Sequence, residues 1–277
     1  MLGYSVFLPS YSVGENCYKE IPYVTRKFGT RAVVIGGKTA MSKAKPELEA
    51  AIKDSDVEIL DYIWYGGDSS YENVEMLKNN PLVTGADMLF GVGGGRACDT
   101  VKTLADMLDK PFFTFPTLAS NCAACTAITV MYNPDGSFKE YYYMHGPSYH
   151  TFINTKIIAD SPEKLLWAGI GDALSKECEV LYAGRDKFMY HTPLMGQCIA
   201  KICTTPLIEY GAKALEACRS NKPDFALEQV ALDIIISTGI VSNFATHENQ
   251  PDPADNYYYN SSLAHCVYSV SYTHLRA

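Results

Sequence analysis

The segment "GVGGGRACDTVK" at residues 91–102 places three consecutive glycines between an apolar run and a stretch with helical character. Gly93, Gly94 and Gly95 carry no Cβ atoms, so a ligand can approach their backbone amides closely. The first amides of a helix are free donors at the positive end of the helix dipole, which favours a phosphate group. The spacing matches neither the Rossmann fingerprint nor a Walker P-loop, so an ordinary structural turn is the alternative.

Small and hydroxylated side chains gather in the segment "FPTLASNCAACTAITVMY", where a further strand is expected to end. The candidates for hydrogen bonds to a phosphate, ribose or carboxamide group are Thr117, Ser120 and Thr126. Such a loop can also satisfy its own backbone, which is the structural alternative. Cys122 and Cys125 form a C-x-x-C pair, but no second pair lies at zinc-finger spacing, so neither a zinc site nor a redox pair is favoured.

A carboxylate and an imidazole in the C-terminal half are the candidate metal ligands. Asp172 lies among small residues in the apolar helical run "WAGIGDALSKECE", and a carboxylate there needs a cation, a helix cap or a metal as its partner. His265 lies in "SSLAHCVY", where a buried core histidine is the alternative. The pair is an incomplete metal shell, because a catalytic divalent metal usually takes three protein ligands.

The composition is typical of a globular protein with reduced thiols. Of the 277 residues, 47% are hydrophobic and 19% charged, and the formal net charge of −8 argues against a nucleic-acid or anionic membrane surface. No apolar run approaches the roughly 20 residues that a transmembrane helix needs, and the N-terminus lacks a signal-peptide pattern. Nine scattered cysteines without a paired framework favour a reducing compartment, so we expect a cytoplasmic protein.

The first part of the chain alternates between strand-like and helix-like runs. Buried strands are expected at 31–37, 57–64, 86–94 and 111–117, with helices between them. This alternation predicts a parallel sheet covered by helices on both faces, with ligands bound at the carboxyl ends of the strands. Further strands without intervening helices are expected in 127–133, 137–144 and 151–160, with a turn at 133–136.

After residue 160 the sequence shows helical periodicity only. Ser161 is expected to cap a helix that has Pro162 at its first position. Helices are expected over 162–183, 191–219 and 224–246, with a last one starting at Ser261. The sequence therefore predicts an α/β dinucleotide-binding domain over residues 1–160 and an α-helical metal-binding domain over residues 161–277.

The order of "GVGGGRACDTVK", "FPTLASNCAACT", "WAGIGDALSKECE" and "SSLAHCVY" resembles the iron-containing (group III) alcohol dehydrogenase superfamily, in its glycerol dehydrogenase-like branch. The resemblance covers residues 5–269 and implies the dehydroquinate synthase-like architecture: a Rossmann-like nucleotide-binding domain, an all-α C-terminal domain and a catalytic metal in the cleft between them. The metal, zinc in the glycerol enzymes and iron in others, would polarise the substrate oxygen while hydride moves to or from NAD or NADP.

The resemblance also implies which residues hold each group. Asp172 and His265 would act in catalysis as ligands of one divalent metal, zinc or iron, and the third ligand is missing from this sequence. The cofactor contacts would fall on Gly93, Gly94, Gly95, Arg96, Asp99, Thr117, Ser120, Thr126, Ile128 and Tyr132.

Three positions depart from the family pattern. Glycerol dehydrogenases have an aspartate that contacts the polyol where this chain has Cys122 in the substrate pocket, a pattern closer to the hydroxycarboxylate dehydrogenases that reduce 2-oxo acids. Lys38 replaces the acid that holds a ribose 2′-hydroxyl and suits the 2′-phosphate of NADP, with a plain surface lysine as the alternative. Tyr268 replaces a histidine that follows the first metal histidine.

The C-terminus departs further, because the family continues for several helices and takes its third metal ligand from a later histidine. The last eight residues, "VSYTHLRA" at 270–277, resemble a translated transposase adapter from sequencing libraries. We therefore expect a C-terminally truncated gene whose native sequence stops near Ser269, and His274 is not assigned as the missing ligand.

The sequence thus predicts a metal- and NAD(P)-dependent oxidoreductase that acts on a small alcohol, a polyol or a 2-hydroxy acid. The alternative is a non-catalytic fragment that binds nucleotide but lacks a metal ligand. A dehydroquinate synthase-type lyase is a weaker alternative, because its phosphorylated substrate needs several basic residues and the region 115–180 has few. The expected partners are a small-molecule substrate and, in the full-length protein, further copies of itself; neither nucleic acid nor a membrane is expected.

Overall fold

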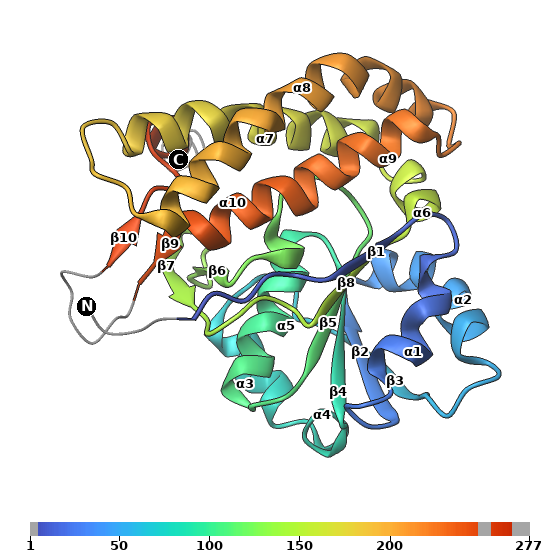
Figure 1. Ribbon diagram of the computed structural model, residues 1–277. Helices are drawn as coiled ribbons and strands as arrows, with labels where there is room; N and C mark the ends of the chain where they lie inside the picture. Colours follow the sequence, from blue (N-terminus) through green and yellow to red (C-terminus); the bar gives the residue numbers. More distant parts are fainter. Residues whose placement is uncertain (1–4, 249–255, 268–277) are drawn as a thin grey trace.

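A six-stranded parallel sheet forms the centre of the computed structural model, which describes residues 5–248 and 256–267 (Figure 1). In sheet order the strands are β1 (Tyr11–Val13), β8 (His150–Ile153), β5 (Phe112–Pro116), β4 (Met88–Gly93), β2 (Arg31–Gly36) and β3 (Glu58–Trp64). All neighbouring strands in this sheet run parallel, which confirms the predicted α/β fold class.

Helices cover both faces of this sheet, because its central strands are apolar on both sides. Val34 and Phe90 pack on the face covered by α2, whereas Val33 and Leu89 face α3 and α5. The helical elements of this part are η1 (Cys17–Glu20), α1 (Ile21–Thr25), α2 (Lys38–Ile52), α3 (Tyr71–Lys78), α4 (Pro81–Gly85), α5 (Gly95–Met107), η2 (Ala123–Cys125) and α6 (Thr155–Ala159).

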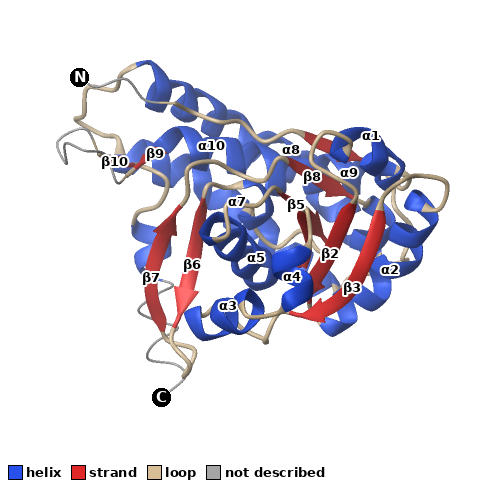
Figure 2. Cartoon of the chain, turned by 90° about the horizontal axis from the view of Figure 1, so that it is seen from below, coloured by secondary structure: helices blue, strands red, loops and turns tan. Residues whose placement is uncertain are grey.

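A separate antiparallel hairpin lies beside the main sheet (Figure 2). It consists of β6 (Ile128–Tyr132) and β7 (Phe138–Tyr143), joined by the predicted turn. In that turn the N–H of Gly136 donates to the carbonyl of Asn133, which confirms the prediction. The hairpin follows the loop after β5 and so forms one wall above the sheet edge.

Two details of the predicted strands were wrong or missed. The run 151–160 is not one strand, because β8 ends at Ile153 and Asn154 then caps α6 by accepting hydrogen bonds from the N–H groups of Lys156 and Ile157. Strand β1 was not predicted, since a strand of three residues carries too little periodicity to be recognised.

From residue 163 onward the described chain is almost entirely helical, and its helices lie together across one end of the sheet (Figure 1). They are α7 (Glu163–Ala183), α8 (His191–Arg219), α9 (Phe225–Leu232), a π-helical segment (Asp233–Ser237) and α10 (Thr238–Ala245); β9 (Thr246–His247) then pairs with β10 (Tyr257–Tyr258). The expected cap at the start of α7 was wrong. Pro162 occupies that position, and the buried Oγ of Ser161 has no hydrogen-bond partner among the described residues.

The stretch Phe225–Ala245 corrects the expectation that no apolar run is long enough to cross a bilayer. These 21 helical residues include an 18-residue window with a mean hydropathy of 1.5, so among the described residues this helix is long and apolar enough to cross a bilayer, by length and composition only. However, 67% of this window is buried inside the molecule, and Leu227 and Ile234 are fully buried in the core of the helical layer. We therefore assign it as a core helix.

Asp233, in the π-helical segment, makes the stability of this layer depend on pH. The residue is 3% exposed, and its Oδ2 has no hydrogen-bond partner in the part of the chain that the structure describes. Burial raises the pKa of this carboxyl to about 7, although Ser237 and Cys203 act to lower it. The folded protein therefore binds a proton that the unfolded chain releases near its ordinary pKa of about 4.

We expect the free energy of unfolding to fall as pH rises from about 4 through about 7, because Asp233 must then ionise in a buried position. Between about pH 5 and about pH 8, the fall in the free energy of unfolding should be about 2 kcal/mol smaller in the Asp233→Asn variant than in the wild type. Urea unfolding at each pH measures this fall. Asp54→Asn, at an exposed position, is the control. An equal pH dependence in wild type and Asp233→Asn would contradict the assignment.

Candidate nucleotide and metal site

A cleft of about 890 Å³ lies between the carboxyl edge of the sheet and α7. Strands β4 and β5 end side by side, with Gly93 paired to Pro116, so the loops that follow them share this edge. The predicted residues that line the cleft are Gly93, Gly94, Gly95, Arg96, Asp99, Ser120, Cys122, Thr126, Ile128, Tyr132, Asp172 and His265. The fold thus brings motifs from both halves of the sequence into one cavity.

Two predicted cofactor residues do not line this cleft. Lys38 is exposed at the start of α2, and its Nζ lies 4.9 Å from the centroid of the Trp64 ring, although the preceding Gly37 does line the cleft. Thr117 is buried, and its backbone N–H donates to the carbonyl of Gly93. Tyr268 and His274 lie outside the described residues.

The glycine turn presents bare backbone to the cleft. Gly93 has a φ of +151°, and a Cβ at this position would lie 2.8 Å from the Cβ of Ala97. Helix α5 begins at Gly95, and no side chain caps it within the described residues. Its first amides are therefore available to an anion, and their contact with a pyrophosphate stays a prediction.

Arg96 is held in place beside this turn. Its Nη1 lies 2.9 Å from Oδ2 of Asp68, and its guanidinium lies 4.7 Å from the centroid of the Tyr132 ring. The ion pair compensates the charge of Arg96, while the stacking joins the start of α5 to strand β6. These two contacts hold the side chains of Arg96 and Tyr132, both predicted cofactor residues, at the rim of the cleft.

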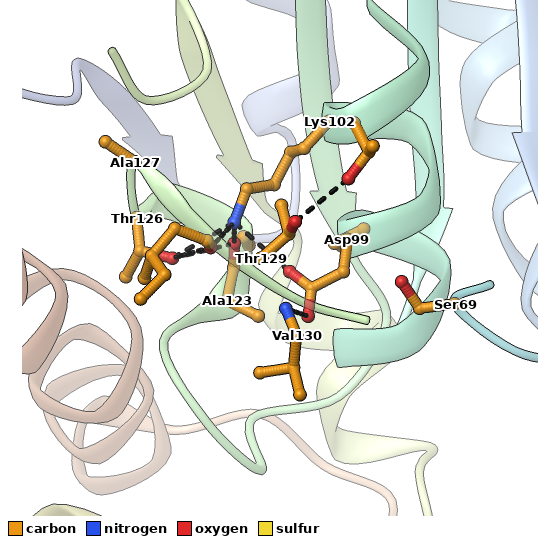
Figure 3. Close-up of polar contacts among 12 residues, drawn as sticks. Ser69, Asp99, Lys102, Ala123, Thr126, Ala127, Thr129 and Val130 are labelled. Carbon is orange, nitrogen blue, oxygen red and sulfur yellow. Dashed lines mark hydrogen bonds and ion pairs between the residues drawn. The ribbon is translucent and has the colours of Figure 1, made fainter. Parts of the chain in front are cut away.

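Lys102 is a fully buried lysine that ties the loop after β5 to α5 (Figure 3). Its Nζ donates to the carbonyls of Ala123 and Ile128, each at 2.7 Å, and to Oγ1 of Thr126 at 3.0 Å. The same ammonium lies 3.2 Å from Oδ1 of Asp99. Four oxygens therefore surround one buried charge, and they fix the wall of the cleft.

Asp99 has a structural role besides the predicted contact with the cofactor. Its Oδ2 accepts a hydrogen bond from the N–H of Val130 at 3.2 Å. Burial raises the pKa of Asp99, while the charge of Lys102 and the Val130 N–H lower it. Sequence analysis missed Lys102, although its i, i+3 spacing from Asp99 places both on one face of a helix.

Asp172 and His265 meet across the cleft. The Nε2 atom of His265 lies 3.7 Å from Oδ1 of Asp172, and its Nδ1 lies 2.5 Å from Oε2 of Glu179. Asp172 lies well inside α7, so the alternative of an N-cap is wrong. His265 is not an isolated core histidine either, because it contacts two carboxylates and is about one-third exposed.

Glu179 fixes the orientation of the histidine. Its Oε1 also accepts the backbone N–H groups of Ser262 and His265. Burial would raise the pKa of Glu179, but the hydrogen bonds from His265 and Ser262 outweigh this effect and lower it to about 2. Sequence analysis missed this residue, although its i, i+7 spacing from Asp172 places both on the same face of α7.

The donor set fits part of a divalent metal shell. A carboxylate oxygen and an imidazole nitrogen are ligands that zinc and iron accept, and a carboxylate on the second ring nitrogen is the usual support of such a histidine. Among residues 5–248 and 256–267, no three His, Cys, Asp or Glu side chains are arranged so that together they could hold a metal ion. Asp172 and His265 are therefore two candidate donors, and their role as metal ligands stays a prediction.

Close packing brings α7 and the loop after β5 together. A Cβ at Gly169 would collide with the carbonyl oxygen of Ala119, so only glycine allows this approach. On the loop, Cys122 lines the cleft, and burial raises the pKa of its thiol, which is therefore neutral at pH 7. Cys125 instead points into the core and donates to the carbonyl of Ile235.

The fold and the cleft define an α/β protein with an open cleft at the carboxyl edge of its parallel sheet and a helical layer that carries candidate metal donors. Residues 9–150 match the family of iron-containing alcohol dehydrogenases, and the chain belongs to this family. The resemblance predicted from the four motifs is thereby confirmed.

Two curated relatives of this chain are named as dehydrogenases. The chain is 30% identical over 226 residues to a glycerol dehydrogenase of Escherichia coli O6:H1. The matched region covers 79% of this chain and 61% of the relative. It is 32% identical over 209 residues to hydroxycarboxylate dehydrogenase A of Escherichia coli K12, which covers 74% of this chain and 55% of the relative. The chain thus spans less than two thirds of these relatives.

Solved structures share the fold. The glycerol dehydrogenase of Schizosaccharomyces pombe superposes with a TM-score of 0.77 at 22% identity, covering 96% of this chain and 66% of that chain. A probable glycerol dehydrogenase from Sinorhizobium meliloti gives a TM-score of 0.77 at 23% identity, covering 96% of this chain and 70% of that chain. These matches support the dehydroquinate synthase-like arrangement of an α/β part and a helical part.

Lys102→Met should lower the free energy of unfolding by about 3–5 kcal/mol, because it leaves Asp99 buried without a counter-charge. Urea denaturation measures this loss. Adding Asp99→Asn to the same chain should recover part of it, since the unpaired charge is then removed. Lys45→Met, which removes an exposed ion pair, should change stability by less than about 1 kcal/mol. A Lys102→Met protein as stable as this control would refute the role of the buried ammonium.

Proposed function

We propose that this chain carries the dinucleotide site and two metal donors of a metal-dependent, NAD(P)-dependent dehydrogenase that acts on a small alcohol, polyol or 2-hydroxy acid. One observation carries the proposal: Asp172 and His265 lie 3.7 Å apart in the same cleft as the triple glycine. The family membership and the dehydrogenase names of the relatives support it.

Each residue has a defined task in this proposal. The amides at the start of α5 hold the pyrophosphate, while Thr126 and Ile128 line the path toward α7. Asp172 and His265 hold zinc or iron, and Glu179 keeps the imidazole in the required orientation. When bound, the metal would polarise the substrate oxygen, and the nicotinamide would exchange a hydride with the carbon that bears this oxygen.

The choice between NAD and NADP rests on Lys38. Its position after β2 suits a 2′-phosphate, but its ammonium already lies over the Trp64 ring, so either cofactor is compatible with the proposal. The proposal also includes a dinucleotide-binding domain at 1–160, a metal-binding domain at 161–277, a cytoplasmic location and a homo-oligomeric full-length protein.

The second candidate function is nucleotide binding without turnover. It is favoured by the absence, within the described residues, of a third ligand beside Asp172 and His265. Oxidation of NADH or NADPH by 2-oxo acids and ketones, with zinc or iron supplied, separates the two functions. Metal-dependent turnover supports the dehydrogenase, whereas nucleotide binding with no turnover on any of these substrates favours the second candidate.

Asp172→Asn should weaken binding of Zn²⁺ by at least about 10-fold, because an amide oxygen is a poorer ligand than a carboxylate. Binding of the dinucleotide should stay unchanged, since the pyrophosphate is assigned to the amides at the start of α5, whereas Asp172 belongs to α7. Titration calorimetry with Zn²⁺ and with NADH gives both values.

Glu177→Gln is the matched control on the same helix, because Glu177 accepts a hydrogen bond from Thr204 and does not line the cleft. Its affinity for Zn²⁺ should equal that of the wild type. Equal affinities in wild type and Asp172→Asn would rule out Asp172 as a metal ligand.

A further inference from the structure

Lys176 places an ammonium group in the cleft, on the side of the metal donors. It lies four residues after Asp172 on α7, so both side chains are on one face of this helix. Lys176, Cys122 and His265 all line the cleft. The lysine is only 2% exposed, so its charge is almost entirely removed from water.

The partners of this ammonium are neutral. Its Nζ donates to Oδ1 of Asn260 at 2.9 Å and to the carbonyl of Asn260 at 3.3 Å. No ion pair joins Lys176 to a carboxylate in the part of the chain that the structure describes. An ammonium has three donors, so one of them is left for another acceptor.

Two other cations in or beside the cleft, in contrast, are paired with carboxylates. Lys102 is also buried, but it lies 3.2 Å from the carboxylate of Asp99. Arg96, which also lines the cleft, lies 2.9 Å from the carboxylate of Asp68. A buried charge without a counter-charge is costly, and a bound anion removes that cost.

The neighbouring loop leaves this charge uncompensated. Burial has the largest effect on the thiol of Cys122 and raises its pKa, so the thiol is neutral. The charges of Lys176 and Asp172 both act on this thiol as well: the first lowers its pKa and the second raises it. An aspartate at this position would supply the missing negative charge. With a cysteine, the charge of Lys176 is free to select an anionic substrate.

We propose that Lys176 binds the carboxylate of the substrate, so that this site selects 2-oxo and 2-hydroxy acids over neutral polyols. The inference rests on the proposed dehydrogenase function and narrows its substrate class. In the reductive direction, the reduced nicotinamide gives a hydride to the 2-oxo carbon, the carbonyl oxygen gains a proton and the carboxylate is unchanged. The products are the 2-hydroxy acid and the oxidised dinucleotide.

A carboxylate fits this position better than a phosphate. Of the described residues that line the cleft, the lysines and arginines are Arg96 and Lys176, and Arg96 is paired with Asp68 beside the glycine turn. One ammonium matches the single charge of a carboxylate, whereas a phosphate dianion takes several cationic groups. The inference therefore commits to the carboxylate.

Titration calorimetry with oxamate, in the presence of NADH and Zn²⁺, tests the inference without requiring turnover. Lys176→Met and Asn260→Asp should each weaken oxamate binding by about 10- to 100-fold. The first removes the ammonium, and the second sets a carboxylate beside it with almost no change of shape. Lys164→Met, at an exposed position on the same helix, should bind oxamate as the wild type does.

Binding results can overturn the inference while the proposed function stands. A wild type that binds NADH but not oxamate would do so, and so would equal oxamate affinity in all variants. Tighter binding of dihydroxyacetone phosphate than of oxamate would also contradict it. In turnover, wild type should prefer 2-oxobutanoate to 1-hydroxybutan-2-one, and Lys176→Met should lose this preference. An equal loss on both substrates would also refute the role of the charge. Absence of NADH binding in the wild type would instead refute the proposed function itself.

Discussion

The buried ammonium of Lys102 is the constraint on which the cleft depends. It lies in α5, about two turns after the first amides of this helix, and it holds the loop after β5 by three oxygens from Ala123, Thr126 and Ile128. These hydrogen bonds add to the burial of Ala124 and Cys125 in the core and to the hydrogen bonds of Asn243 with Cys125 and Ala127, which also hold this loop. Asp99 compensates the charge and links the same centre to the hairpin strand β6.

The second lobe of the site depends on close packing and on a different buried charge. Gly169 allows α7 to touch the loop after β5, which brings Asp172 to the edge of the cleft. Glu179 then orients His265 through the ring nitrogen that faces away from Asp172. Two acidic residues of α7 therefore have different roles. Asp172 lines the cleft as a candidate metal ligand, and the buried Glu179 supports His265.

Sequence patterns predicted the fold and most of the cleft because both depend on regular spacing. Apolar runs such as 86–94 identified the central strands, and glycines followed by a helix identified the turn that lines the cleft at the start of α5. The patterns did not reveal Lys102 or Glu179, since a charged residue in a helix is usually on the surface. Only the tertiary structure shows that these positions are buried and paired.

The central claim is that a dinucleotide crosses the bare backbone at Gly93–Gly95 and points its nicotinamide toward Asp172 and His265. A crystal structure of the chain with NADH and Zn²⁺, with the metal located by anomalous scattering, tests this claim most directly. We expect the pyrophosphate on the first amides of α5 and the Zn²⁺ within bonding distance of both side chains. A dinucleotide bound elsewhere, or with its nicotinamide turned away from these residues, would contradict the account.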